Sequence, residues 1–279
     1  MATISSDKVL TPMKLASESS AEFGKDRMIG LELETTRNYK TLPNVEGVEW
    51  ETSHWSFTGA QVDAIKQIMS PLNKELIAMV GRDGGDIEIA TQPMTHSYLE
   101  ISHEFKDLIH NMDKYCIPDD ESGTHIHISK LKTDKKVLWR NLYWFSVVFD
   151  RQLYAIFRRT SNWARSPREL LQSSVGSKPK MSITDAGIHR YPIYGNKGTI
   201  IVKRANTYEC RGGSASTDYK EIKAWALMFY NIVEFCNQTS IVGHRFEEIL
   251  PENDYGEILK QRLTTEQLRQ IVPIDVYKR

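Results

Sequence analysis

The chain has 279 residues, enough for one large domain or two modest ones with a substantial core. Lysine plus arginine and aspartate plus glutamate number 36 each, and this zero net charge argues against a general nucleic-acid or membrane-surface binder. No apolar run approaches the roughly 20 residues of a membrane span, and the polar N-terminus lacks the apolar core of a signal peptide. The three cysteines are odd in number and lack the spacing of a metal site. Together these features favour a reducing cytoplasm.

The first half of the chain alternates strand and helix patterns. Residues 28–36 alternate apolar and polar side chains and predict a strand, and Pro93 ends a second strand predicted at residues 85–91. Residues 97–115 predict one amphipathic helix that starts at a Ser97-x-x-Glu100 capping box and has Ile101 on its apolar stripe. Another helix is expected between the two strands, with one apolar face formed by Val62, Ile65, Ile68 and Met69.

The second half adds strands and longer helices. A helix is expected to begin at an Asp218-x-x-Glu221 box, and the tail after residue 242 is polar with one short helix. The other expected elements are a strand at 123–130, one long helix at 137–157, an irregular stretch at 160–198, strands at 199–204 and 207–211, and the tail helix at 265–271.

The fold class follows from these elements and from a missing signature. No glycine-rich strand–turn–helix of the Rossmann or P-loop type occurs. We therefore predict an α+β fold with an antiparallel or mixed sheet and helices on one face. The expected division is a polar N-terminal extension (1–27), a catalytic domain (28–241) and a C-terminal helical, polar tail (242–279).

Four of the predicted strands each offer one apolar face and one face of charged or imidazole side chains. Residues two apart in a strand share a face. Each such residue alone could be an ordinary solvent-facing side chain, but nearly all of them are of metal-ligand type. The positions that point away from the core are Glu32 and Glu34, Asp86 and Glu88, His125 and His127, and Glu209 and Arg211.

This pattern predicts a metal site. Glu32 and Glu34 would lie roughly 6–7 Å apart on one strand. Their repulsion is on the order of 2–3 kcal/mol at an effective dielectric of about 20, and a cation between them would reverse its sign. Carboxylates suit Mg²⁺ or Mn²⁺, and imidazole shifts the preference toward Mn²⁺ or Zn²⁺. Four carboxylates and a histidine match two ions about 3.5–4 Å apart better than one.

Four motifs in this order resemble a known family. They are GLELE (30–34), RDGGDIEIATQP (82–93), GTHIH (123–127) and YECRGGSAST (208–217), with Trp225 in the helix that follows. Over residues 28–237 the chain is similar to the amidoligases of the glutamine-synthetase-like carboxylate–amine ligase fold. The resemblance implies a sheet of the glutamine synthetase catalytic type that binds ATP with Mg²⁺ or Mn²⁺.

The resemblance also implies residue roles. Glu34 and Glu88 would hold one ion, and Glu32, His125 and Glu209 would hold the other. Arg211 would lie over the transferring phosphoryl group and act in catalysis with Arg204. A further carboxylate has two competing equivalents, Asp83 and Asp86. The nucleotide would be bound by His127, Lys203, Arg190 and Arg211, and the phosphate loop of the family is matched loosely by Arg190, Lys197, Lys203 and Arg204.

The function implied is an ATP-dependent carbon–nitrogen ligase. Phosphorylation turns a carboxylate oxygen into a leaving group, so the expected route is an acyl phosphate that an amine attacks, with metal ions and arginine supplying charge neutralisation. Small-molecule or peptide carboxylates and amines are the expected substrates, with a protein substrate also possible. Family members occur in bacteria and their phages, which implies the cytoplasm, or the host cytoplasm for a phage protein.

Other functions stay open at this point. A metal-dependent hydrolase could use the same carboxylates and histidines, a transglutaminase or protease could use Cys210, and a phage structural or binding protein could keep the fold without activity.

One segment of the chain is strongly basic. Residues 158–204 contain ten basic and two acidic residues, a net of +8. They could form a flexible cover over phosphate and acidic substrate, a patch for nucleic acid or an acidic partner, or a solvated loop.

Overall fold

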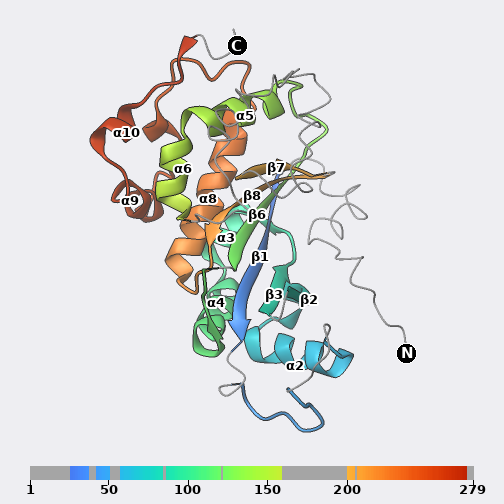
Figure 1. The fold of residues 1–279 in the computed structure, drawn as a ribbon. Coiled ribbons are helices and arrows are strands. Elements are labelled where there is room, and N and C mark those ends of the chain that lie inside the picture. The colour runs from blue at the N-terminus through green and yellow to red at the C-terminus, as the bar shows by residue number, and fades with distance from the viewer. Residues whose placement is uncertain are drawn as a thin grey trace, which may run out of the picture.

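A computed structural model describes residues 26–37, 42–50, 57–83, 86–120, 122–158, 200–204 and 206–274. Its centre is one eight-stranded sheet (Figure 1). Six of the strands follow the order β2-β3-β1-β6-β8-β7, and the other two, the short β4 and β5, pair with β1. All the pairings are antiparallel. The strands are β1 (Met28–Arg37), β2 (Ile77–Asp83), β3 (Asp86–Thr91), β4 (Met94–Thr95), β5 (Cys116–Ile117), β6 (Gly123–Ser129), β7 (Ile201–Lys203) and β8 (Thr207–Ser214).

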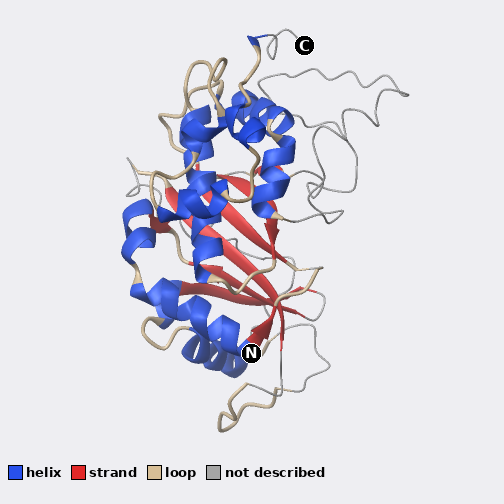
Figure 2. Cartoon of the chain, turned by 90° about the vertical axis from the view of Figure 1, so that its left-hand side faces the viewer, coloured by secondary structure: helices blue, strands red, loops and turns tan. Residues whose placement is uncertain are grey.

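The helices gather on one side of this sheet (Figure 2), so the predicted α+β class with helices on one face is confirmed. Among the described residues, none of the helices is long and apolar enough to cross a bilayer. They are α2 (Gly59–Met69), α3 (His96–Ile101), α4 (His103–Tyr115), α5 (Leu138–Val148), α6 (Asp150–Phe157), α8 (Tyr219–Cys236), α9 (Asp254–Lys260) and α10 (Thr265–Arg269), with 3₁₀ turns η2 (Lys74–Leu76) and η4 (Phe246–Ile249).

The core lies between the sheet and α8. Helix α8 touches β1, β6 and β8, and it is buried on most sides. Its Trp225 is fully buried and donates its indole N–H to the carbonyl of Ile156, 2.7 Å away. On the strand side the core takes Ile29, Leu31 and Leu33, as the alternation of residues 28–36 predicted.

Strand β2 was missed by the sequence analysis. It pairs with β3 from Ile77↔Thr91 to Asp83↔Asp86, with a register shift between Ile77 and Met79. The Asp-Gly pair at residues 83–84 is a typical signal of a hairpin between two strands. Only the strand on one side of that pair was predicted.

The single helix predicted at residues 97–115 is two helices. Thr95, not Ser97, caps the first helix by accepting a hydrogen bond from the Tyr98 N–H. The backbone is extended at Ser102. The Ser102 hydroxyl accepts a hydrogen bond from the Phe105 N–H and so caps α4. Ile101 is 77% exposed at this break, so it does not belong to the apolar stripe.

The helix predicted at residues 137–157 is also divided, and the tail holds more structure than expected. Buried Phe149 separates α5 from α6 with non-helical backbone angles. Asp218 caps α8 through the N–H groups of Lys220 and Glu221, as predicted. The tail forms η4, α9 and α10, and η4 and α9 pack against α8.

Candidate metal and phosphate site

The strand register brings most of the predicted site residues onto one face of the sheet. Glu32 of β1 lies opposite His125 of β6, and Glu34 lies opposite Glu88 of β3. His127 of β6 lies opposite Glu209 of β8. Directly opposed residues in antiparallel strands have Cβ atoms about 4.5–5.5 Å apart on the same face. Four strands therefore contribute to one charged surface.

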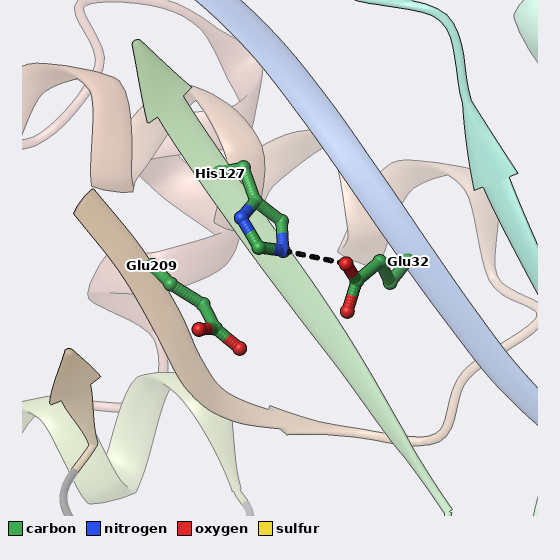
Figure 3. Close-up of side chains that lie close together, drawn as sticks. All are labelled: Glu32, His127 and Glu209. Atoms are coloured by element: carbon green, nitrogen blue, oxygen red, sulfur yellow. Dashed lines mark ion pairs between the residues drawn. The ribbon is translucent and has the colours of Figure 1, made fainter. Parts of the chain in front are cut away.

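Three of these residues form a group that could hold a metal ion. Single ligand atoms of Glu32, His127 and Glu209 all lie within 4.8 Å of one another. The three residues are buried, with exposed fractions of 6%, 1% and 0%. Figure 3 shows the imidazole of His127 above the two carboxylates, with its Nε2 atom 3.1 Å from Oε1 of Glu32.

Two buried atoms of this group have no hydrogen bond. Glu32 Oε1 and His127 Nε2 face each other across 3.1 Å, yet within the described part of the chain neither has a partner with hydrogen-bonding geometry. Buried polar atoms are nearly always paired, so this calls for an explanation. Neighbouring ligands of an octahedral ion with bonds of 2.0–2.1 Å lie about 3 Å apart, so the spacing suits two ligands of one Mg²⁺ or Mn²⁺ ion.

His125 lies between the carboxylates. Its Nδ1 atom is 3.1 Å from Glu32 Oε2, 3.6 Å from Glu34 Oε1 and 3.9 Å from Glu209 Oε1. The sequence analysis placed His125 with Glu32 and Glu209 and gave His127 to the surrounding pocket. The structure groups His127 with those two carboxylates and puts His125 beside them, within reach of Glu34 as well.

Glu34 and Glu88, predicted to hold the other ion, are cross-strand neighbours. Like charges placed directly opposite each other destabilise a sheet unless something balances them. Gly81 of β2 pairs with Glu88, and a Cβ atom at Gly81 would lie 3.6 Å from Glu88 Oε2. For Asp83 and Asp86 the structure describes the backbone only, at the paired ends of β2 and β3.

Two arginines converge on Glu209. Arg211 donates from Nη1 to Glu209 Oε1 at 2.5 Å, and Arg204 pairs through Nε with Glu209 Oε2. Arg211 is buried and Arg204 is half-buried. Lys203 is not brought to this group, because it pairs with core-facing Tyr208 and its ammonium lies 6.0 Å from the ring centre of Trp139. Arg190 lies outside the described residues.

The electrostatics keep both carboxylates ionised. Burial alone would raise the pKa of Glu209, but the charge of His127, the hydrogen bond from Arg204 and the charge of Arg211 outweigh it and lower this pKa to about 2. Burial likewise opposes ionisation of Glu32, but His127 and His125 hold its pKa well below the usual range. The pKa of His127 is raised by Glu32 against the effect of burial. A bound cation would take the place of that imidazolium proton.

Cys210 cannot serve as a nucleophile in this structure. It lies on the core face of β8 and is fully buried, which raises the pKa of its thiol to about 12. Only the thiolate is nucleophilic, so the thiol stays inert at neutral pH. Cys116 and Cys236 are also buried and free. The cysteine-dependent transglutaminase or protease is therefore excluded.

An ionic cluster around the buried Glu221 in the first turn of α8 was not predicted from the sequence. Glu221 accepts hydrogen bonds from Ser216 Oγ at 2.6 Å, Arg158 Nη1 at 3.0 Å and Arg262 Nη2 at 2.6 Å. Sequence reasoning took Glu221 for the second member of a helix capping box. Two of these partners, Arg158 and Arg262, are 63 and 41 residues away in the sequence, so no local pattern could have indicated them.

Both ends of the basic segment rest on β8 beside Arg211. Arg158 forms an isolated bridge with Gly213, and the carbonyl of Ile200 accepts a hydrogen bond from the Arg211 N–H at 2.8 Å. The contact is close, because a Cβ atom at Gly212 would lie 2.6 Å from Ile200. Residues 159–199, which include most of the predicted basic cover, lie outside the described part of the chain.

The sequence matches no protein-family model and no curated relative. Several solved structures are similar to the fold. The ligase PafA in complex with the prokaryotic ubiquitin-like protein Pup shares 14% identity over 88% of this chain and 52% of its own, with a TM-score of 0.35. The complex of GmaS with ADP has 10% sequence identity to this chain, and the match covers 95% of this chain and 65% of GmaS, with a TM-score of 0.44. A novel glutamine synthase homologue has 13% sequence identity to this chain, and the match covers 95% of this chain and 62% of the homologue, with a TM-score of 0.35.

These similarities are distant. The chain spans about half to two thirds of the length of the structures it resembles. The function proposed below rests on the chain's own residues.

Proposed function

We propose that this chain is an ATP-dependent ligase that joins a carboxylate to an amine with the help of Mg²⁺ or Mn²⁺. The observation that carries the proposal is the buried group of Glu32, His127 and Glu209, flanked by Arg211 and Arg204. Ionised, buried carboxylates, one of which has an oxygen without a hydrogen bond, suit a divalent cation, and guanidinium groups beside a cation suit phosphate oxygens.

Glu32, His127 and Glu209 would hold one ion, with His125 close enough to ligate it or to orient Glu32. Glu34 and Glu88 would hold a second. Bound there, the ions would neutralise the phosphate oxygens of ATP during transfer of the terminal phosphoryl group. Glu209 has a further part, since it holds both arginines on the same side of the sheet.

Arg211 and Arg204 would have different tasks because their exposures differ. Arg211 is buried and fixed on Glu209, so its planar fork can contact two oxygens of the phosphoryl group in transfer. Arg204 is half-buried at the end of β7, where it can bind a phosphate before transfer. We keep His127 and Arg211 as nucleotide contacts, and Arg190 and Lys203 as phosphate contacts that approach from outside this group.

The proposed reaction has two steps. A carboxylate oxygen of the substrate attacks the terminal phosphorus of ATP, the bond to the bridging oxygen breaks, and ADP leaves, which gives an acyl phosphate. The amine nitrogen then attacks the carbonyl carbon, phosphate leaves with the former carboxylate oxygen, and the nitrogen loses a proton. Small-molecule or peptide substrates, a protein substrate and a place in the cytoplasm, of a host cell if a phage encodes the chain, belong to the same proposal.

The test is a trapping experiment. A panel of carboxylates labelled with ¹⁸O is incubated with ATP, Mn²⁺ and hydroxylamine, which converts an acyl phosphate into a hydroxamate. We expect one ADP and one ¹⁸O-labelled phosphate per hydroxamate formed. Glu209→Gln should abolish the product, and the surface variant Glu248→Gln should retain it, since Glu248 is exposed and its carboxylate contacts His244, outside the site.

Other outcomes would point to other functions. Release of AMP would indicate an adenylating enzyme, and unlabelled phosphate would indicate ATP hydrolysis without acyl transfer. Hydrolysis of an ester or amide with Mn²⁺ and without ATP, which releases a carboxylate, would support the metal-dependent hydrolase. A chain that binds neither Mn²⁺ nor ATP would support the inactive structural or binding protein.

A further inference from the structure

A basic surface lies where the loop between β6 and α5 meets the turn between β7 and β8. The Lys130 N–H donates to the Asn206 carbonyl at 2.9 Å, and its ammonium donates to the Arg204 carbonyl. Figure 1 shows the green loop that follows β6 passing the end of β7. We call this surface the basic rim, and its six cations are Lys130, Lys132, Lys135, Lys136, Lys203 and Arg204.

The one acidic side chain of the loop is turned inward. Asp134 is the only acidic residue among residues 130–140. Its carboxylate pairs with the buried guanidinium of Arg27 and accepts a hydrogen bond from the Leu131 N–H at 3.0 Å. Asp134 is therefore engaged mainly by Arg27, although its charge also favours the charged form of Lys130, and Lys132, Lys135 and Lys136 of the rim are exposed.

Two lysines of the rim are held close together over aromatic rings. The ammonium of Lys130 lies 5.4 Å from the ring centre of Tyr208, and that of Lys203 lies 6.0 Å from the ring centre of Trp139. The two rings are stacked, with centres 6.3 Å apart. Burial and then the charge of Lys203 lower the pKa of Lys130 to about 8. An anion placed between the two ammonium groups would relieve this repulsion.

The rim adjoins the candidate site. Lys130 follows His127 by three residues, so its side chain points to the opposite face of the sheet, where it lies over Tyr208. Arg204 belongs to both regions, since its guanidinium pairs with Glu209 while its carbonyl accepts from Lys130. A chain that lies on the rim could reach the Glu32–His127–Glu209 group by passing Arg204 at the edge of the sheet, where β7 is the last strand.

We propose that the basic rim binds an acidic peptide segment, and that this segment carries the carboxylate that the site activates. The inference rests on the proposed function, because a ligase of this kind consumes a carboxylate. An acidic peptide suits the rim better than nucleic acid. The whole chain has no net positive charge, and the aromatic pair of Trp139 and Tyr208 is already stacked within the protein instead of being open to bases.

The experiment measures peptide binding without ATP or metal. A fluorescent octaglutamate is titrated with the full chain, and its anisotropy is followed at several salt concentrations. The test variant is Lys132→Gln, Lys135→Gln, Lys136→Gln. The matched control is Lys106→Gln, Lys114→Gln, Lys220→Gln, which removes three exposed lysines from α4 and α8. We expect binding to weaken at least tenfold in the test variant and less than twofold in the control, and to fall as salt rises.

Two results would overturn the inference. One is an equal loss of binding in both triple variants, or no binding by the parent at low salt, since either would show that the rim is no docking surface. The other is at least tenfold tighter binding of a single-stranded oligonucleotide with the same number of charges, which would make the rim a nucleic-acid surface. The peptide titrations use neither metal nor ATP, so a failure of the peptide-binding inference can be told apart from a failure of the proposed ligase reaction in the hydroxamate experiment.

Discussion

The two faces of the central sheet are both buried, but they differ in chemistry. Leu31 and Glu32 are neighbours on β1 and point to opposite faces, and both are nearly or fully inaccessible to solvent. The helix-covered face is apolar and gains stability by removing Leu31 from water. The other face buries Glu32 and Glu209, which costs free energy unless partners offset it.

This contrast indicates where function lies. The apolar face needs only side chains of suitable shape and volume to fill the core, and many apolar residues meet that requirement. A buried face of ionised carboxylates, imidazoles and guanidiniums contains atoms without hydrogen bonds, such as Glu32 Oε1 and His127 Nε2, even in a well-packed sheet. Strongly shifted pKa values beside buried atoms without hydrogen bonds are frequent at functional sites, and on this face the shifted groups are Glu32 and Glu209.

The largest effect should come from the apolar face. Leu31→Ala removes a fully buried side chain and should lower the free energy of unfolding by about 2–5 kcal/mol, measured by urea denaturation. Because Leu31 points away from the site, the Mn²⁺ affinity of the folded protein should stay within about twofold of the parent. A variant that folds well but loses Mn²⁺ binding would break the separation of the two faces.

The next largest effect concerns Arg211. Arg211→Lys keeps the charge but loses the planar fork, so turnover in the hydroxamate assay should fall on the order of 10²–10³-fold with little change in nucleotide affinity. The free energy of unfolding should change far less than in Leu31→Ala. If nucleotide affinity drops by the same factor as turnover, Arg211 serves ground-state binding and not the transfer step.

A smaller effect is expected from metal binding. Mn²⁺ or Mg²⁺ at a hundredfold excess over its dissociation constant should stabilise the protein by about 2.7 kcal/mol, seen as a rise in melting temperature. Glu32→Gln or Glu209→Gln should remove this response, and the exposed Glu248→Gln should keep it. An unchanged Mn²⁺ response in both site variants would place the metal elsewhere.

The smallest effect is expected from acid. In the metal-free protein the pKa of Glu209 is lowered to about 2 from its usual value near 4.5, so its stabilising contribution is present above pH 4.5 and is lost as pH falls toward 2. Between pH 6 and pH 4 the loss should be on the order of 1 kcal/mol. The stability difference between the parent and Glu209→Gln should therefore shrink on acidification, while that for Leu31→Ala should not change with pH.

Sequence reasoning reached the charged face because strand alternation is local. It found the strands that carry Glu32, His127 and Glu209 and the helix cap at Asp218. It failed where distant contacts overrule local pattern. The helix expected at residues 97–115 breaks at Ser102, where the buried Lys223 of α8 donates to the Glu100 carbonyl. Ser97 has a glutamate three residues on and Thr95 does not, so the local pattern favoured Ser97, whereas the folded chain uses Thr95 as the cap.

The sequence by itself determined which residues share a strand face, because successive side chains of any strand point to opposite sides. It therefore determined that Glu32 and Glu34, His125 and His127, and Glu209 and Arg211 each point one way. Only the tertiary structure decided which strands lie side by side and in what register, and hence that His127 faces Glu209 while His125 lies among three carboxylates. The physical reason is that backbone hydrogen bonds join strands in many registers equally well, so the choice depends on how the whole core packs.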